Sequence, residues 1–133
     1  MFEFISTGKY GEVRKRIIFH PMDWEGVYSL AFGNIGPAGE IDDHTITDNG
    51  DRNKILATIA RVVDYYTICY PRRWIYFRGN SKEKTRLYRM AVGLHLKELS
   101  SVFEIFGEVE GSDFIPFHKN MEISAFLIRR KLF

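Results

Sequence analysis

The chain has 133 residues, of which 45% are hydrophobic and 27% are charged, a balance typical of one globular domain and not of a disordered segment. The net charge of +2 gives no general argument for nucleic-acid binding, and no apolar run approaches the roughly 20 residues of a membrane span. We therefore expect a single domain over residues 1–133. We also expect a cytoplasmic location, because the one cysteine, Cys69, allows no internal disulfide.

The first third of the chain is predicted to form strands. Apolar and β-branched residues recur over 2–6, 12–20 and 27–35, and turns that contain glycine or proline separate these stretches. A loop rich in glycine follows and leads into residues 40–51, where five residues are acidic.

The middle of the chain predicts a helix, a strand and a second helix. The first helix runs from about Arg52 to Tyr70, because apolar residues recur at steps of three and four and Pro71 stops it. Its apolar positions are Ile55, Ile59, Val62, Val63 and Tyr66. The strand covers 73–77, with Trp74, Tyr76 and Arg78 on one face and Ile75 and Phe77 on the other.

The second helix is predicted from Ser81 to about Leu99. Asn80 and Glu83 have the spacing of a capping box, and Leu87, Ala91 and Leu94 define the stripe that we expect to face the sheet.

Two further strands are predicted near the C-terminus, over 102–109 and 122–132. The second of these segments would also be tolerated as a helix, but its alternating apolar residues favour a strand. The resulting order is β-β-β-α-β-α-β-β. We expect an α+β fold with two layers, in which a largely antiparallel sheet carries both helices on one face.

Positive charge is concentrated where the predicted strand meets the second helix. Seven basic residues and one acidic residue lie between Arg72 and Arg89. The candidate anion-binding residues are Arg78, Asn80, Ser81, Lys82, Arg86 and Arg89. A helix N-terminus offers free N–H donors, Gly79 would let a ligand approach the backbone, and the basic side chains would project from one helix face. The same pattern is typical of a solvated helix face, and this alternative stays open.

The segments GNSKEKTRLYRMAV (79–92) and EISAFLIRRK (122–131) resemble those of a family of short bacterial domains of unknown function. That family carries a Gly-Ser pair and a Thr-Arg-Leu-Tyr-Arg block, which corresponds to residues 85–89 here. The likeness runs from about Asp51 onward and implies a shared fold without an activity. Here Asn-Ser-Lys-Glu-Lys precedes the block in place of the small residues expected, which argues against a tight phosphate loop.

A strand followed by a helix with Arg-Leu-Tyr (86–88) also resembles the C-terminal half of acetyltransferases of the GNAT type. Those enzymes bind the coenzyme A pyrophosphate with an Arg/Gln-x-x-Gly-x-Gly/Ala loop. The stretch GNIGPAG (33–39) has the glycines without the preceding basic residue, so the resemblance does not extend to transferase chemistry.

Other chemistries have little support in the sequence. Carboxylates could bind a divalent ion near Asp42, Asp43, His44 and Asp48, but such loops are usually solvated, and no metal site is predicted. Cys69 is expected to be a buried structural thiol, and His95 to lie at the edge of the core. No catalytic residue and no cofactor is assigned.

Two hypotheses for the function follow. The first is a binding domain whose basic residues contact an anionic partner, either nucleic acid or an acidic protein surface. Trp74 and Tyr76 could stack on bases, although we expect them on the inner face of the sheet. The alternative is an enzyme that uses a nucleotide or coenzyme A, with phosphate at the N-terminus of helix 81–99. We expect no membrane partner, and an exposed strand edge would permit a homodimer.

Overall fold

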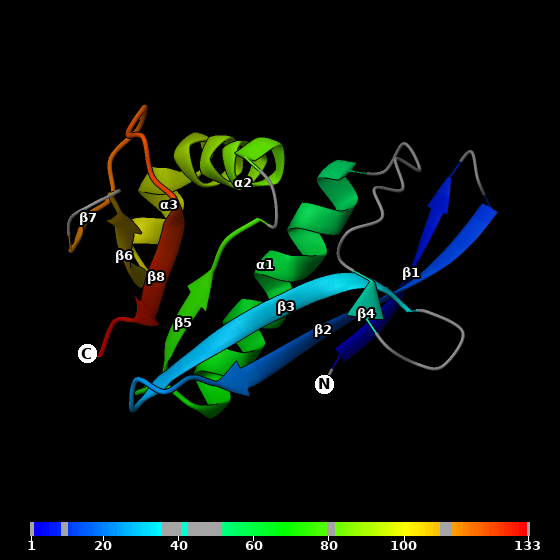
Figure 1. Ribbon diagram of the computed structural model, residues 1–133, viewed down its shortest axis with the longest axis horizontal. Helices are drawn as coiled ribbons and strands as arrows, with labels where there is room; N and C mark the ends of the chain where they lie inside the picture. The colour runs from blue at the N-terminus through cyan, green and yellow to red at the C-terminus, as the bar shows by residue number, and fades with distance from the viewer. Residues whose placement is uncertain are drawn as a thin grey trace.

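The computed structural model describes residues 2–8, 11–35, 41–42, 52–79, 82–109 and 113–132. The strands are β1 (Phe2–Gly8), β2 (Gly11–Pro21), β3 (Val27–Ile35), β4 (Ile41–Asp42), β5 (Trp74–Phe77), β6 (Phe103–Glu108), β7 (Phe114–Pro116) and β8 (Ala125–Arg130). The helices are α1 (Arg52–Cys69), α2 (Lys82–Leu94) and α3 (Leu96–Ser100). Figure 1 shows α1 behind the curved β2–β3 pair, with α2 near the ends of β5 and β8.

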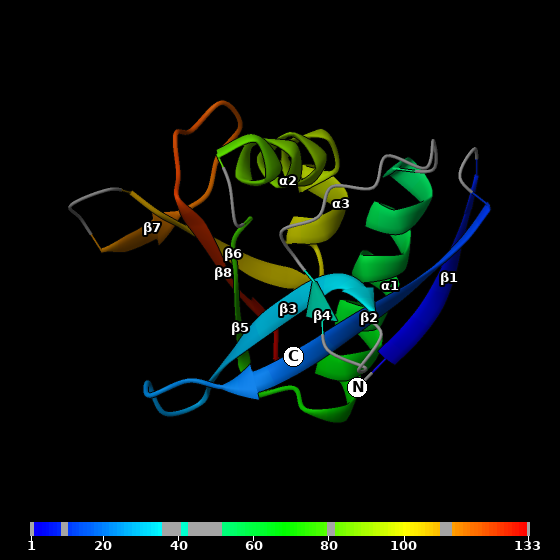
Figure 2. The ribbon, with the colours of Figure 1, turned by 45° about the vertical axis from the view of Figure 1, so that its right-hand side comes forward.

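One sheet joins the described strands in the order β1-β2-β3-β5-β8-β6-β7, and β4 pairs with β3 off this path (Figure 2). The strand pairs are antiparallel except β3 with β5, which are parallel because α1 carries the chain back between them. The prediction of an α+β fold with a largely antiparallel sheet is confirmed, as is the order of the main elements. The short elements β4, α3 and β7 were not predicted.

Alternation along β5 shows which face of the sheet the helices cover. Ile75 is fully buried and packs with Val63 and Tyr66 of α1, whereas Phe77 lies against Tyr88 of α2. Because side chains two residues apart point to the same side of a strand, both helices cover the same face. The prediction that Ile75 and Phe77 share one face of β5, opposite Trp74 and Tyr76, is therefore confirmed.

The core has two parts on this covered face. The buried residues Val63, Tyr66, Ile75, Phe103 and Ile128 form the part under α1. The buried residues Phe117, Met121 and Phe126 form the part near α2. The stripe predicted for α1 is confirmed at Val63 and Tyr66, and Ile59 packs against them. The side chain of Ile55 lies outside the described part of the chain.

The stripe predicted for α2 is wrong by about one residue position. Tyr88 and Val92 of α2 pack on the core near Phe126, and Leu96 of α3 continues this row, which we call the sheet-facing stripe. Leu94, expected to be buried, is 75% exposed. Two stripes of apolar residues that start one residue apart lie about 100° apart around a helix. Both have the same spacing in the sequence, so the spacing alone does not show which stripe faces the sheet.

The predicted helix 81–99 is divided at His95. This residue has φ −110° and ψ 17°, outside helical geometry, and separates α2 from α3. The C-terminal segment, which was ambiguous, forms the strand β8, and four of its six residues are buried. Its position between β5 and β6, with a helix-covered face, explains why its apolar residues are so densely spaced.

The opposite face of the sheet carries Trp74 and Tyr76, so the expectation that they lie on its inner face is wrong. The guanidinium of Arg129 lies 4.3 Å from the centre of the Trp74 ring, and Phe106 packs on the edge of that ring. Tyr76 packs on the edge of Phe114. These aromatic rings therefore already have partners within the chain. We call the face of the sheet that carries Trp74 and Tyr76 the outer face.

Candidate anion-binding site and adjoining groove

The turn between β5 and α2 is tied to the helix through Gly79. Its N–H donates to Oγ1 of Thr85 at 3.1 Å, and this hydroxyl also lies 3.4 Å from the Gly79 carbonyl oxygen. A Cβ atom at position 79 would lie within 2.7 Å of backbone atoms of Lys84 and Thr85. Glycine is therefore required here by packing within the chain, and the expectation that it admits a ligand stays a prediction.

Most of the predicted anion-binding side chains that the structure describes are available to solvent. Arg78, at the end of β5, is exposed, as are Lys82 and Arg86, which lie one turn apart on α2. Within the described part of the chain, no acidic side chain forms an ion pair with any of these three. Asn80 and Ser81 lie outside the described residues.

Arg89 differs from the other cations. Its Nη1 lies 3.3 Å from Oε1 of Glu122 and 3.5 Å from the carbonyl oxygen of Met121. The side chain is largely buried, at 20% exposure. Arg89 therefore anchors α2 to the segment before β8, and its charge is partly neutralised.

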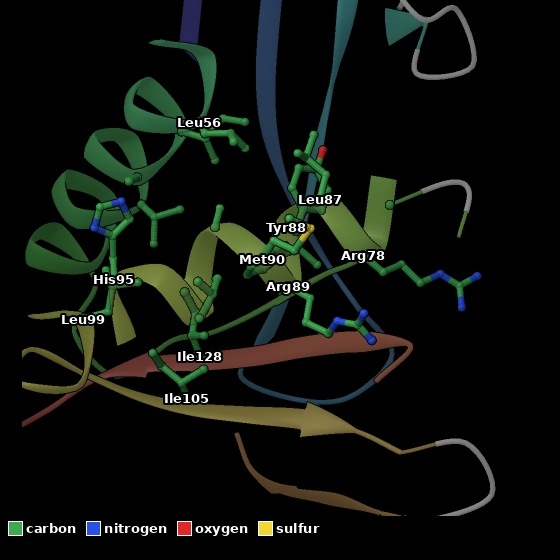
Figure 3. A pocket seen from close by; sticks show the side chains of 18 of the residues that line it. Leu56, Arg78, Leu87, Tyr88, Arg89, Met90, His95, Leu99, Ile105 and Ile128 are labelled. Carbon is green, nitrogen blue, oxygen red and sulfur yellow. The ribbon is translucent and has the colours of Figure 1, made fainter. Parts of the chain in front are cut away.

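A groove of about 1490 Å³ opens between α1 and α2 over the covered face of the sheet. The α1 wall includes Leu56, Ile59 and Val63. The α2 wall includes Leu87, Met90, Ala91 and Leu94, which we call the groove-facing stripe. Leu30, Phe77, Phe103, Ile105 and Ile128 line it from the sheet. Figure 3 shows Leu56 across from Leu87 and Met90, with Arg78 and Arg89 away from α1 and His95.

The groove-facing stripe exposes apolar surface on a helix that is already packed by its other side. Met90 is 60% exposed and Leu94 is 75% exposed. Sequence reasoning missed Met90, although six of the eight residues from 87 to 94 are apolar, including tyrosine. One buried stripe needs only three or four apolar positions in two turns. The additional apolar residues in this segment were therefore the sequence feature that indicated a second apolar stripe on the helix.

The charged residues that line the groove are mostly basic. Among the described residues they are Arg78, Lys84, Arg86, Arg89 and Lys119, against the single acid Glu98. The structure therefore brings Arg78, Arg86 and Arg89 to one groove. Lys82 lies on α2 but does not line the groove.

Near this site, burial and the carboxylate of Glu108 raise the pKa of Tyr76, while Arg78 opposes the shift. The Tyr76 phenol is therefore neutral at physiological pH, and the charge beside it comes from the guanidinium. A neutral phenol next to an exposed arginine supplies a hydrogen-bond donor and a positive charge, without a group that could act as a base near pH 7.

The other candidates carry no defined chemistry. Cys69 is exposed, so the expectation of a buried thiol is wrong, and His95 is exposed instead of lying at the core edge. In the part of the chain that the structure describes, His, Cys, Asp and Glu side chains form no group of three that could hold a metal ion. The candidate ligands Asp43, His44 and Asp48 lie outside that part. No described helix is long and apolar enough to cross a membrane.

Comparison with known proteins gives a family and no activity. Neither the curated proteins nor the solved structures yielded a match. The profile of a family of unknown function (DUF6934) matches residues 1–131. It does not bear on the block at 85–89 or on the acetyltransferase resemblance. With this match, the chain belongs to DUF6934, a family of unknown function.

Proposed function

We propose that this protein is a binding domain that receives an anionic protein partner where β5 meets α2. The contact residues in the described part are Arg78, Lys82 and Arg86, which we call the basic junction. The observation that carries the proposal is that all three are exposed and that no described acidic side chain pairs with them. Guanidinium groups that are not paired with a carboxylate of their own chain can form bidentate contacts with carboxylates of another chain.

An acidic protein surface is favoured over nucleic acid by the position of the aromatic residues. Proteins that bind single strands combine a basic groove with rings on which bases stack. Here Trp74 is covered by Arg129, and Tyr76 contacts Phe114, both on the outer face of the sheet. The groove beside the basic junction is lined mostly by aliphatic residues. The aromatic residues in its lining are half-buried or buried: Phe32, Tyr76, Phe77, Tyr88 and Phe103.

An enzyme that binds a nucleotide or coenzyme A has less support. A tight phosphate site needs a backbone that a ligand can approach closely. Gly79 instead packs against Lys84 and Thr85. The arrangement supplies charge and apolar surface, which suit recognition of another chain.

The test compares binding of a fluorescent polyglutamate peptide to the wild type, Arg86→Ala and Arg89→Ala. We expect Arg86→Ala to weaken binding about tenfold, equivalent to about 1.4 kcal/mol, and Arg89→Ala to weaken it less, because Glu122 partly neutralises Arg89. Arg61→Ala is the matched control, since Arg61 is exposed on α1 and does not line the groove.

Equal losses in all three variants that disappear at high salt would mean that the residues only contribute to a diffuse charge. An oligothymidylate that binds more tightly than polyglutamate, with a steep salt dependence, would assign the basic junction to nucleic acid instead.

A further inference from the structure

The apolar groove next to the basic junction is not explained by charge recognition. Leu87, Met90, Ala91 and Leu94 add little to the core, because Tyr88, Val92 and Leu96 already fix the helices to it. Exposed apolar surface that is contiguous and bordered by charge is a common mark of a binding site. Met90 and Leu94 are the most exposed members of the groove-facing stripe.

The size of the groove indicates the kind of occupant. Its volume of about 1490 Å³ exceeds the roughly 300–1,000 Å³ of typical small-molecule pockets. A helix about 10 Å wide and about 18 Å long, which is about 12 residues, fills roughly 1400 Å³. The walls are themselves two helices, α1 and α2, with the sheet as a floor, which is the setting in which a third helix can bury one face.

The charges around the groove specify the polar face of such a helix. Within the described residues, five basic side chains line the groove against Glu98, and Arg78, Arg86 and Lys119 have no ion-pair partner. A helix with apolar residues toward the groove floor and carboxylates along its borders would match this distribution. Nucleic acid would leave the aliphatic helix walls of the groove without a contact.

We infer that the groove between α1 and α2 binds one amphipathic helix of an acidic protein partner. This inference rests on the proposed function, because the same partner supplies the carboxylates for the basic junction. Leucine or similar side chains at positions i, i+3, i+4 and i+7 of the partner would contact the groove-facing stripe. Specificity then comes from the apolar spacing, and the charges set the approach and orientation.

The experiment uses three labelled peptides of 16 residues and measures their binding by fluorescence anisotropy. One has leucines at helical spacing and glutamates elsewhere, one is a scrambled version of the same composition, and one is polyglutamate. We expect the amphipathic peptide to bind at least tenfold more tightly than the scrambled one. Equal affinities for the two would overturn the inference.

Two variants separate the apolar contact from the electrostatic one. Leu94→Ser removes an exposed leucine, so the fold should persist, and it should weaken binding of the amphipathic peptide at least fivefold while leaving polyglutamate unchanged. Ile68→Ser is the matched control, because Ile68 is 56% exposed on α1 and does not line the groove. It should leave the affinity of every peptide unchanged.

The outcomes distinguish the two proposals. If Arg86→Ala weakens all peptides but Leu94→Ser weakens none, the basic junction is a charge site and the helix inference is wrong. If Leu94→Ser weakens the amphipathic peptide and Arg86→Ala has no effect on any peptide, the groove binds a helix and the proposed role of the basic junction is wrong.

Discussion

The structure gives Gly79 a different role from the one that the sequence suggests. In the sequence it precedes a basic helix and suggests a phosphate loop, but its backbone lies too close to Lys84 and Thr85 for a side chain at this position. The Thr85 hydroxyl then closes the turn by bonding to both the N–H and the carbonyl of Gly79. The glycine therefore stabilises the start of α2 and sets the position of the basic junction.

We predict that Gly79→Ala lowers the free energy of unfolding by about 1–3 kcal/mol, because the added methyl group collides with the α2 backbone. Gly93→Ala is the comparison, since a Cβ there meets only Cγ of Lys119, at 3.6 Å. This change should be neutral or should stabilise the protein by up to about 1 kcal/mol through helix propensity. Urea unfolding measures both, and a Gly79→Ala variant as stable as the wild type would contradict the packing role.

The helix α2 has two apolar sides with different roles. Its sheet-facing stripe holds it in place, and its groove-facing stripe remains open in the described part of the chain. Arg89 adds a polar anchor through Glu122 and the Met121 carbonyl. The helix is thus fixed on the side of β8 and available on the side of α1.

Substitutions on the two sides should differ in their effect on stability. Val92→Ala should lower the free energy of unfolding by about 1–2 kcal/mol, because Val92 packs on the core near Phe126. Leu94→Ala should change it by less than about 0.5 kcal/mol, because the side chain is mostly in solvent. Chemical unfolding of both variants checks this order, and a larger loss for Leu94→Ala would restore the stripe predicted from the sequence.

The positions of the main helices and strands were predictable because their apolar periods are clear. The helix after Arg52, the strand around Ile75 and the C-terminal strand all follow the expected alternation. The rotation of α2 was not predictable, since apolar residues surround much of this helix and spacing allows two stripes. The break at His95 and the short strands β4 and β7 depend on tertiary pairing, which a local pattern does not encode.

The candidate site was predictable only in part. The cluster of basic residues is visible in the sequence, and the structure brings Arg78, Arg86 and Arg89 to one groove. The neutralisation of Arg89 by Glu122 was not visible, because the two residues are far apart in the chain. The exposure of Cys69 was also not predicted, because its apolar neighbours in the sequence do not show which side of α1 it occupies.

Across the described part of the molecule, the two faces of the sheet differ in how much of their apolar surface is open. The outer face has its aromatic rings in contact with one another and with Arg129. The covered face is filled under α1 and near Phe126, and open between the helices. Basic side chains lie along this opening, although the net charge of the chain is only +2.

The central claim is that the groove and the basic junction form one binding surface for an acidic amphipathic helix. Methyl NMR during titration with the amphipathic Leu/Glu peptide tests it most directly. We predict that the methyl groups of Leu56, Ile59, Leu87, Met90 and Leu94 shift together, while those of Ile5, Ile68 and Leu132 stay in place. Shifts concentrated at Leu127 and other methyl groups near the outer face, or no shift in the groove at saturating peptide, would contradict the claim.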